Sequence, residues 1–295
     1  MPVGEASILA RGNSLPLIGK GECVKIAVCP LLRNRKIFLM QAENFSLPAY
    51  LERIAYRGEA RADLPTLFSL MRHQLFAVPF ENLDVQAGKI ISLVPEDIVD
   101  KIVRRRRGGY CYEVNGIFSM ALQALGISYR YVAARPMFYP ARRPRTHMAL
   151  VVTLDGADWL CDLGFGSYGL RAPIRIDTFD AEVRQDHDTF MLGKSEVGEI
   201  VLRAKVEGEW VNQYGFDLSR QEWVDFAPAN YMNSTHPEAI FVKQYIVVLH
   251  TEAGRKILSG DTFKVVEQGH TSKREIAPED RTGLLAREFG LAVAP

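Results

Sequence analysis

The sequence predicts an α+β protein whose three parts follow one another along the chain. Residues 41–126 carry apolar side chains at helical spacing between capping residues and glycines, which predicts a helical bundle. Residues 127–230 divide into short strand-like runs separated by Gly, Pro and Asp, which predicts a barrel or a strongly bent sheet. Residues 231–295 mix strand-like runs with one helical segment.

The composition is that of an ordinary soluble globular protein. Of 295 residues, 47% are hydrophobic and 24% are charged, and the formal net charge is +1. Neither nucleic acid nor a membrane is expected as a partner, because the charge is balanced and no apolar run approaches roughly 20 residues. Cys23, Cys29, Cys111 and Cys161 show neither a disulfide framework nor a zinc-binding spacing. We therefore expect a reducing, cytoplasmic setting and no metal site.

Residues 1–40 differ from the rest of the chain. They carry six Lys or Arg against two acidic residues, with scattered Gly and Pro and no sustained period. A secretory signal would need a longer apolar core and a small-residue cleavage site. We interpret the segment as a flexible extension that the chemistry does not need, with Met40 as an alternative start.

Capping residues predict the first two helices, and a third is predicted from its apolar residues between a proline and two glycines. The first is expected to begin after Ser46 and to end at Gly58, and the second begins after Asp63. The third runs from about Pro95 into four arginines and ends at residues 108–109, which are both glycine. The arginines are expected to form a solvated helix end, where cations are favourable.

The fourth helix begins at Cys111. Apolar residues recur at helical spacing from Val114 to Leu125, and Gly126 ends the helix. A helix N-terminus stabilises an anion through its free N–H groups and its dipole. The two preceding glycines let the backbone approach closely or adopt a positive φ. Because the thiolate is the nucleophilic form of cysteine, this position predicts a reactive thiol.

The remaining elements are predicted from short runs. Strands are expected in YRYVAARPMF, HMALVVTL, ADWLCDLGF, EIVLRAKV and WVNQYGF, and then in FVKQYIVVLH and DTFKVVEQ. A last helix is expected in PEDRTGLLAREFG.

A base for the thiol is predicted from one hairpin. His147 begins a strand that leads to a tight turn, and a two-residue turn at Asp155–Gly156 would place Asp162 opposite Ala149. A four-residue turn would place Asp162 opposite Val151 instead. Either register leaves Asp162 on the sheet face of His147, because alternation depends only on parity. In the first register the two are diagonal neighbours, roughly 7–8 Å apart, which is near enough for an Asp–His hydrogen bond.

Each of these residues also has a purely structural interpretation. A cysteine on an apolar helix face usually packs, as we expect of Cys161, and a histidine on a strand is usually a satisfied core residue. A buried carboxylate at Asp162 is harder to explain in this way, because it is costly without a partner. The hypothesis of a catalytic site rests on the coincidence of all three residue types.

Several segments together resemble the arylamine N-acetyltransferase family. RGGYCYEVN is similar to the R-G-G-x-C-x-E-x-N signature of that family, and PFENLDV resembles its P-F-E-N-L segment. THMALVV and CDLGFG resemble its histidine strand and its D-x-G-F-G segment. NYMNSTHPEAIF is similar to a further segment, with Ala239 at a usually small polar position. The resemblance covers residues 41–295, and residues 1–40 have no counterpart in it.

The resemblance implies a Cys-His-Asp triad, as in cysteine proteases, on a helical bundle, a β-barrel and a C-terminal α/β lid. By matching positions, Cys111 is the nucleophile, His147 the base and Asp162 the residue that orients it. The implied reaction is ping-pong: acetyl-CoA acylates the cysteine, and an arylamine, arylhydrazine or N-hydroxyarylamine takes the acetyl group. Acetyl-CoA is then a co-substrate, and no cofactor is bound permanently.

The resemblance also assigns supporting residues. Phe80, Phe165 and Phe241 match aromatic positions that line the acceptor pocket of the family, although hydrophobic core is the competing interpretation. The signature motif adds Arg107, Gly108, Gly109, Glu113 and Asn115, of which we expect the last two to supply an ion pair and helix capping.

Two questions remain open at this level. The loop with Arg142, Arg143 and Arg145 could meet the phosphates of CoA, or it could be a solvated surface loop. A thiol hydrolase or transglutaminase-like enzyme would use the same triad order, and an amide synthase acting on a carrier-bound acyl chain would share the fold. An intact triad argues against a binding module without catalysis. Neither the physiological acceptor, the acyl-chain preference nor the oligomeric state follows from the sequence.

Overall fold

The computed structural model describes residues 40–166 and 168–292. The expected N-terminal extension, apart from Met40, therefore lies outside the described residues. None of the helices within these ranges is long and apolar enough to cross a membrane.

Helices form the first part of the described chain, and their predicted caps are confirmed. The side chain of Ser46 accepts the N–H of Ala49, and that of Asp63 accepts the N–H of Thr66. The helices are α1 (Leu47–Arg53), α2 (Leu64–Ala77), α3 (Leu83–Gln86), α4 (Pro95–Val99) with a π-helical continuation (Asp100–Arg104), and α5 (Cys111–Ala124). The first helix ends earlier than Gly58, because Ala55 takes a left-handed conformation with φ of 55°.

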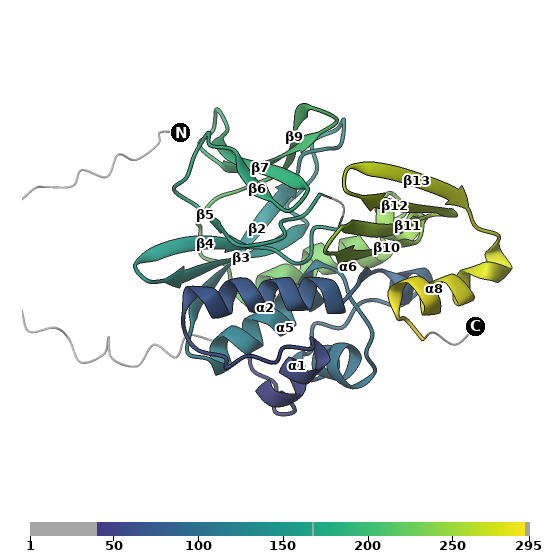
Figure 1. Cartoon of the computed structure of the whole chain (residues 1–295), viewed down its shortest axis with the longest axis horizontal. Coiled ribbons are helices and arrows are strands. Elements are labelled where there is room, and N and C mark those ends of the chain that lie inside the picture. The colour runs from purple at the N-terminus through teal and green to yellow at the C-terminus, as the bar shows by residue number, and fades with distance from the viewer. Residues whose placement is uncertain (1–39, 167, 293–295) are drawn as a thin grey trace, which may run out of the picture. The chain divides into compact units, whose positions relative to one another are not determined.

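Eight antiparallel strands form a nearly closed barrel above these helices (Figure 1). The strands are β2 (Ser128–Pro136), β3 (His147–Leu154), β4 (Ala157–Cys161), β5 (Ile174–Arg175), β6 (Val183–Gln185), β7 (Asp188–Lys194), β8 (Ile200–Val206) and β9 (Glu209–Phe216). Their order is β5-β4-β3-β2-β9-β8-β7-β6. Gln185 at the end of β6 bonds to the backbone of Arg171 and Ala172 next to β5, so side-chain bonds link the two edges.

The hairpin between β3 and β4 has the two-residue turn. Leu154 pairs with Ala157, and Asp155 and Gly156 both have positive φ, at 51° and 73°. This register, which continues to Leu150 opposite Cys161, is the first of the two predicted alternatives. The next residue, Asp162, therefore leaves the strand on the side of His147.

A second, five-stranded sheet lies at the C-terminal end. It has the order β1-β10-β11-β12-β13 and is packed by α8 (Arg281–Phe289), which Gly290 ends at φ of 65°. Its strands are β1 (Phe80–Glu81), β10 (Ile246–Thr251), β11 (Gly254–Ser259), β12 (Thr262–Glu267) and β13 (His270–Glu275). The edge strand β1 comes from the helical part of the sequence, so this sheet is not built from residues 231–295 alone.

Two expectations in this region need correction. The predicted strand FVKQYIVVLH begins as a helix, α7 (Ile240–Lys243). The side chains of Asn82 and Gln86 both donate to the carbonyl of Phe241 within this helix. The boundary expected at residue 230 falls inside α6 (Ala227–Thr235), which follows a 3₁₀ turn (Trp223–Phe226). The buried residues of α6 are the polar Asn230, Asn233 and Ser234. Its sequence therefore contains no apolar stripe from which the helix could be predicted.

The apolar interior forms two clusters. The larger one joins the helices to the barrel, and α5 packs on β2 and β3 at its centre. The smaller one lies between the C-terminal sheet and α8. The first turn of α5 lines a cavity whose other walls come from the barrel and from α6 and α7.

Candidate active site

The first turn of α5 is held by glycines and a glutamate. Glu113 Oε2 accepts the N–H of Tyr110 at 3.0 Å, which caps the helix that begins at Cys111. A Cβ on Gly109 would lie 2.6 Å from Glu113 Cβ, and one on Gly108 would lie 2.0 Å from the carbonyl oxygen of Pro79. Neither glycine has a positive φ, so close approach and not backbone handedness requires them.

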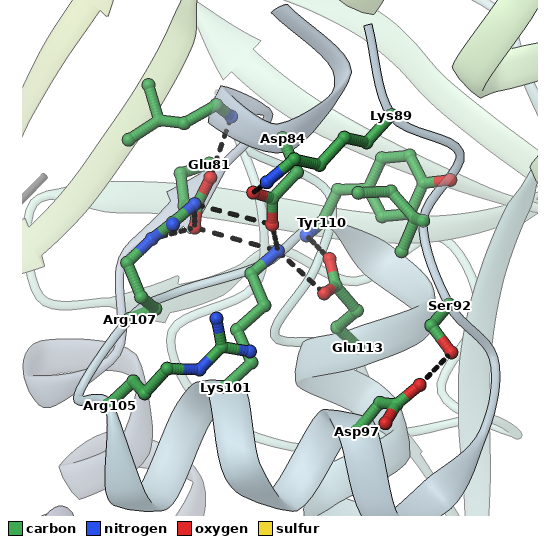
Figure 2. Close-up of polar contacts among 12 residues, drawn as sticks. Glu81, Asp84, Lys89, Ser92, Asp97, Lys101, Arg105, Arg107, Tyr110 and Glu113 are labelled. Carbon is green, nitrogen blue, oxygen red and sulfur yellow. Dashed lines mark hydrogen bonds and ion pairs between the residues drawn. The ribbon is translucent and has the colours of Figure 1, made fainter. Parts of the chain in front are cut away.

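A buried ion cluster lies under this turn (Figure 2). Lys101 Nζ is 2.7 Å from both Glu113 and Asp84 and 3.8 Å from Glu81. Arg107 binds Glu81 at 2.7 Å. Three carboxylates thus share two buried cations at the base of the helix that carries Cys111.

The arginine run divides at its last member. Arg104, Arg105 and Arg106 are exposed, as expected of a solvated helix end. Arg107 has a side chain that is only 13% exposed and belongs to the ion cluster. The motif arginine is thus ion-paired with Glu81 and Asp84 and is not part of the solvated helix end.

The cluster shifts the pKa of its members. Burial lowers the pKa of Lys101, but the three carboxylates raise it above its usual range. Burial raises the pKa of Glu113, Lys101 lowers it and Glu81 raises it, with the result at about 7. The cap of α5 therefore titrates near neutral pH.

His147, the first residue of β3, and Asp162, which follows the end of β4, lie together in the site. His147 Nε2 is 2.7 Å from Asp162 Oδ2, and the two residues are 5% and 1% exposed. Asn115 donates to Asp162 Oδ1 at 3.1 Å and accepts the N–H of Leu163 at 2.9 Å, and the N–H of Gly164 also binds that carboxylate. Asn115 thus ties α5 to the end of β4.

The charges of this pair stabilise each other. Burial lowers the pKa of His147, but Asp162, and after it Cys111, raise it to about 10. Burial raises the pKa of Asp162, and His147, the N–H of Gly164 and Asn115 bring it below its usual range. An imidazolium beside a carboxylate is therefore the favoured state at neutral pH.

Cys111 and His147 open into one cavity of about 60 Å³. Phe165 and Phe241 line it too, whereas Phe80 lies behind Phe241 with ring centroids 5.9 Å apart. Gly164 forms part of the wall, and a Cβ there would lie 2.5 Å from the Cα of Cys111. The structure thus brings two of the three predicted phenylalanines to the thiol.

Two aromatic contributions were missed in the sequence. Tyr214 is buried, with its ring 5.0 Å from that of His147 and 4.9 Å from that of Phe165. Burial, and then Asp162, raise the pKa of Tyr214 well above its usual value. Phe138 packs edge-on against Phe165 at 5.7 Å. Tyr214 comes from β9, and its apolar strand pattern carries no sign of the contact with His147.

The three arginines before His147 have different surroundings. Arg145 binds Glu199 at 2.8 Å and Asp217 at 2.6 Å, and these contacts hold it on the barrel. Arg142 is exposed, whereas Arg143 lines the cavity. Only Arg143 is therefore placed at the entrance to the thiol.

The described residues hold no group of three or more His, Cys, Asp or Glu that could bind a metal ion. In the same ranges, Cys111 and Cys161 are free and buried, and burial raises the pKa of Cys161.

Comparisons with known proteins agree on one family. A family model described as N-acetyltransferase matches residues 63–295. Arylamine N-acetyltransferases of Mycobacterium tuberculosis and Escherichia coli are 35% and 33% identical to this chain. The first match covers 84% of this chain and 90% of the relative, and the second covers 83% and 88%.

Solved structures give the same result. The arylamine N-acetyltransferase of M. tuberculosis superposes with a TM-score of 0.80 at 35% identity, covering 84% of this chain and 94% of that one. The Mycobacterium marinum enzyme in complex with CoA has a TM-score of 0.79 at 31% identity, covering 84% of this chain and 93% of that one.

Proposed function

Because the chain belongs to the arylamine N-acetyltransferase family, and is therefore an acyltransferase with acetyl-CoA as co-substrate, we propose that it carries the acetyl group on Cys111. The acceptor is an arylamine, an arylhydrazine or an N-hydroxyarylamine. The observation that carries the proposal is the 2.7 Å bond between His147 and Asp162 at the cavity that contains the thiol. This is the arrangement of nucleophile, base and orienting carboxylate that thiol catalysis requires.

The first half-reaction acylates the enzyme. The Cys111 thiolate, paired with the His147 imidazolium, attacks the thioester carbon of acetyl-CoA and forms a tetrahedral oxyanion. N–H groups at the start of α5 are placed to bind that oxyanion. The bond to the CoA sulfur then breaks, His147 supplies the proton to that sulfur, and CoA leaves as a thiol.

The second half-reaction transfers the acetyl group. The amine nitrogen attacks the new thioester, and neutral His147 accepts the proton that the nitrogen loses. The bond to the sulfur of Cys111 breaks, and the thiolate returns beside the imidazolium. Phe165 and Phe241 supply an apolar surface that orients an aromatic ring for this attack.

The supporting residues act on geometry. Asp162 holds the imidazole in place and stabilises its charged form, and Asn115 fixes that carboxylate to α5. Glu113 fixes the N-terminal turn that presents Cys111. None of the supporting residues needs to touch a substrate.

Intact-mass spectrometry tests the proposal directly. Acetyl-CoA without an acceptor should add about 42 Da, an acetyl group in place of hydrogen, and the adduct should map to Cys111. Adding an arylamine should then remove it and yield the acetylated amine. Cys161→Ser is the matched control and should keep the adduct, because that thiol is buried away from the cavity.

The test has clear contrary results. A wild-type protein that gains no adduct from fresh acetyl-CoA would exclude the thioester. An adduct that water removes as fast as amines do would favour a hydrolase. An adduct released only to a carrier-bound substrate would favour an amide synthase.

A further inference from the structure

The backbone carbonyl of Thr146 accepts two hydrogen bonds from buried side chains. Tyr112, the residue after the thiol, donates its hydroxyl to this carbonyl at 2.9 Å, and Asn233 Nδ2 donates to it at 2.9 Å. Tyr112 is fully buried, and Asn233 is 6% exposed. Because Tyr112 belongs to α5 and Asn233 to α6, this one carbonyl joins both helices to the start of β3.

The same peptide group carries the N–H of His147. A peptide group is planar, so a carbonyl held in place also fixes the plane from which the backbone of His147 continues. The ladder between β2 and β3 ends at the pair of His147 with Ala134, and Thr146 lies beyond this last pair. The two side chains therefore hold the backbone of the base at the point where strand pairing ends.

The bond to Asp162 orients the imidazole but does not by itself set its distance from the thiol. Asp162 follows β4, which pairs with β3, so the carboxylate and the histidine belong to the same part of the molecule. Asn115 ties the carboxylate to α5, and Tyr112 ties the carbonyl of Thr146 to the same helix. These two ties, one to each half of the His–Asp pair, hold it against the helix that carries the thiol.

The polar buried face of α6 has a use in this arrangement. Asn233 bonds the carbonyl of Thr146, and Ser234 Oγ is 3.1 Å from the hydroxyl of Tyr110, the residue before the thiol. α6 thus contacts the tyrosine on one side of Cys111 directly, and it shares an acceptor with the tyrosine on the other side.

We infer that Tyr112 and Asn233 are positioning residues: by holding this carbonyl they keep the imidazole of His147 within reach of the thiol. A displacement of about 1 Å in an active site can cost roughly 100-fold in rate. Loss of one donor leaves the buried carbonyl with one partner, whereas loss of both leaves it with none, which is the more costly state. The inference rests on the proposed function, because it concerns the base that activates the thiol.

Tyr112→Phe, Asn233→Leu and the double variant test this role by their acylation rates. Single-turnover acylation of Cys111 by acetyl-CoA should fall about two- to tenfold in each single variant, the value of one hydrogen bond. In the double variant it should fall by more than the product of the two factors, because the two donors share one acceptor. A loss no larger than that product would overturn the inference.

Alkylation by iodoacetamide separates positioning from a merely structural role and needs no acetyl-CoA. The rate at Cys111, mapped by mass spectrometry, is measured at pH 7 and at pH 9.5. At pH 7 it depends on the imidazolium of His147, whereas at pH 9.5 an ordinary thiol is mostly ionised without help. The ratio of the two rates, pH 7 over pH 9.5, should fall about twofold in Tyr112→Phe and further in the double variant.

Tyr50→Phe is the matched control, because it also removes the hydrogen bond of a fully buried tyrosine, to Gln74 at 2.7 Å, and Tyr50 does not line the cavity. It should lower the thermal unfolding midpoint about as much as Tyr112→Phe and leave the alkylation ratio unchanged. A wild-type ratio in Tyr112→Phe, or an equal fall in Tyr50→Phe, would overturn the inference even if the double variant does not fold. If acetyl-CoA leaves no adduct on the wild type, the proposed function fails, and the alkylation ratios alone decide the positioning role.

Discussion

His147 and Asp162 are buried together, and neither charge would be stable there alone. Their hydrogen bond uses Nε2 of the ring and leaves Nδ1 as the nitrogen available to Cys111. The carboxylate is satisfied further by Asn115 and by the N–H of Gly164. The two residues therefore depend on each other, because the Asp162 carboxylate is the main group that keeps the proton on the imidazole ring.

Asp162→Asn tests that dependence. An amide in place of the carboxylate carries no charge and can face the ring with its N–H₂ group, which favours the wrong tautomer. Turnover should fall roughly 10³- to 10⁴-fold while the fold is retained. Steady-state rates and thermal unfolding measure the two effects. Asp158→Asn, in β4 and ion-paired with Arg130 near the surface, should keep its turnover. Near-normal turnover of Asp162→Asn would contradict the catalytic triad.

The N-terminal turn of α5 depends on a titrating group. Burial raises the pKa of Glu113, Lys101 lowers it and Glu81 raises it, to about 7 against an ordinary value of 4.5. The folded protein therefore binds this proton more tightly than the unfolded chain. Its contribution to stability is complete below about pH 4.5 and is lost as the pH rises through 7.

Glu113→Gln should remove this dependence. The glutamine can still accept the N–H of Tyr110, but it carries no proton to lose. Urea unfolding of both proteins between pH 4.5 and 8 should show the stability of the wild type falling relative to the variant. The slope should be at most about 1.4 kcal/mol per pH unit. A difference between the two proteins that does not vary with pH would contradict the assignment.

The elements that could be predicted are those with complete local signals. An apolar stripe and a final glycine predict α5, and the alternation of the two strands around Asp155–Gly156 puts Asp162 on the sheet face of His147 in either register. The motif located the same residues independently.

The elements that could not be predicted depend on distant partners. The two residues of β1 are a strand only because β10 pairs with them, and α7 is a helix whose carbonyls are held by Asn82 and Gln86. Tyr214 and Arg143 reach the site through packing that no local pattern encodes. The small volume of the cavity belongs to the same class, since it results from four separate segments.

Across the whole described body, three parts meet at one cluster of charged residues, of which Arg171 and Arg255 are buried. Arg171, which follows the active-site loop, is 1% exposed and binds Asp186 of the β6–β7 turn at 2.7 Å. Arg72 of α2 binds the same carboxylate at 2.7 Å. Arg255 of the C-terminal sheet binds Asp188 at 2.8 Å. The cluster therefore links the barrel, the helices and the second sheet.

Arg171→Met should weaken that link selectively. It leaves the carbonyl of Gly254 without a donor and two partly exposed carboxylates with one cation each, a loss of about 1–3 kcal/mol. Because the second sheet has its own small core, hydrogen exchange in β10 to β12 should increase more than in β2 and β3. Arg175→Met breaks an exposed ion pair with Asp177. It should leave both the thermal unfolding midpoint and the hydrogen-exchange pattern almost unchanged. Equal effects of the two substitutions would mean that the cluster does not hold the parts together.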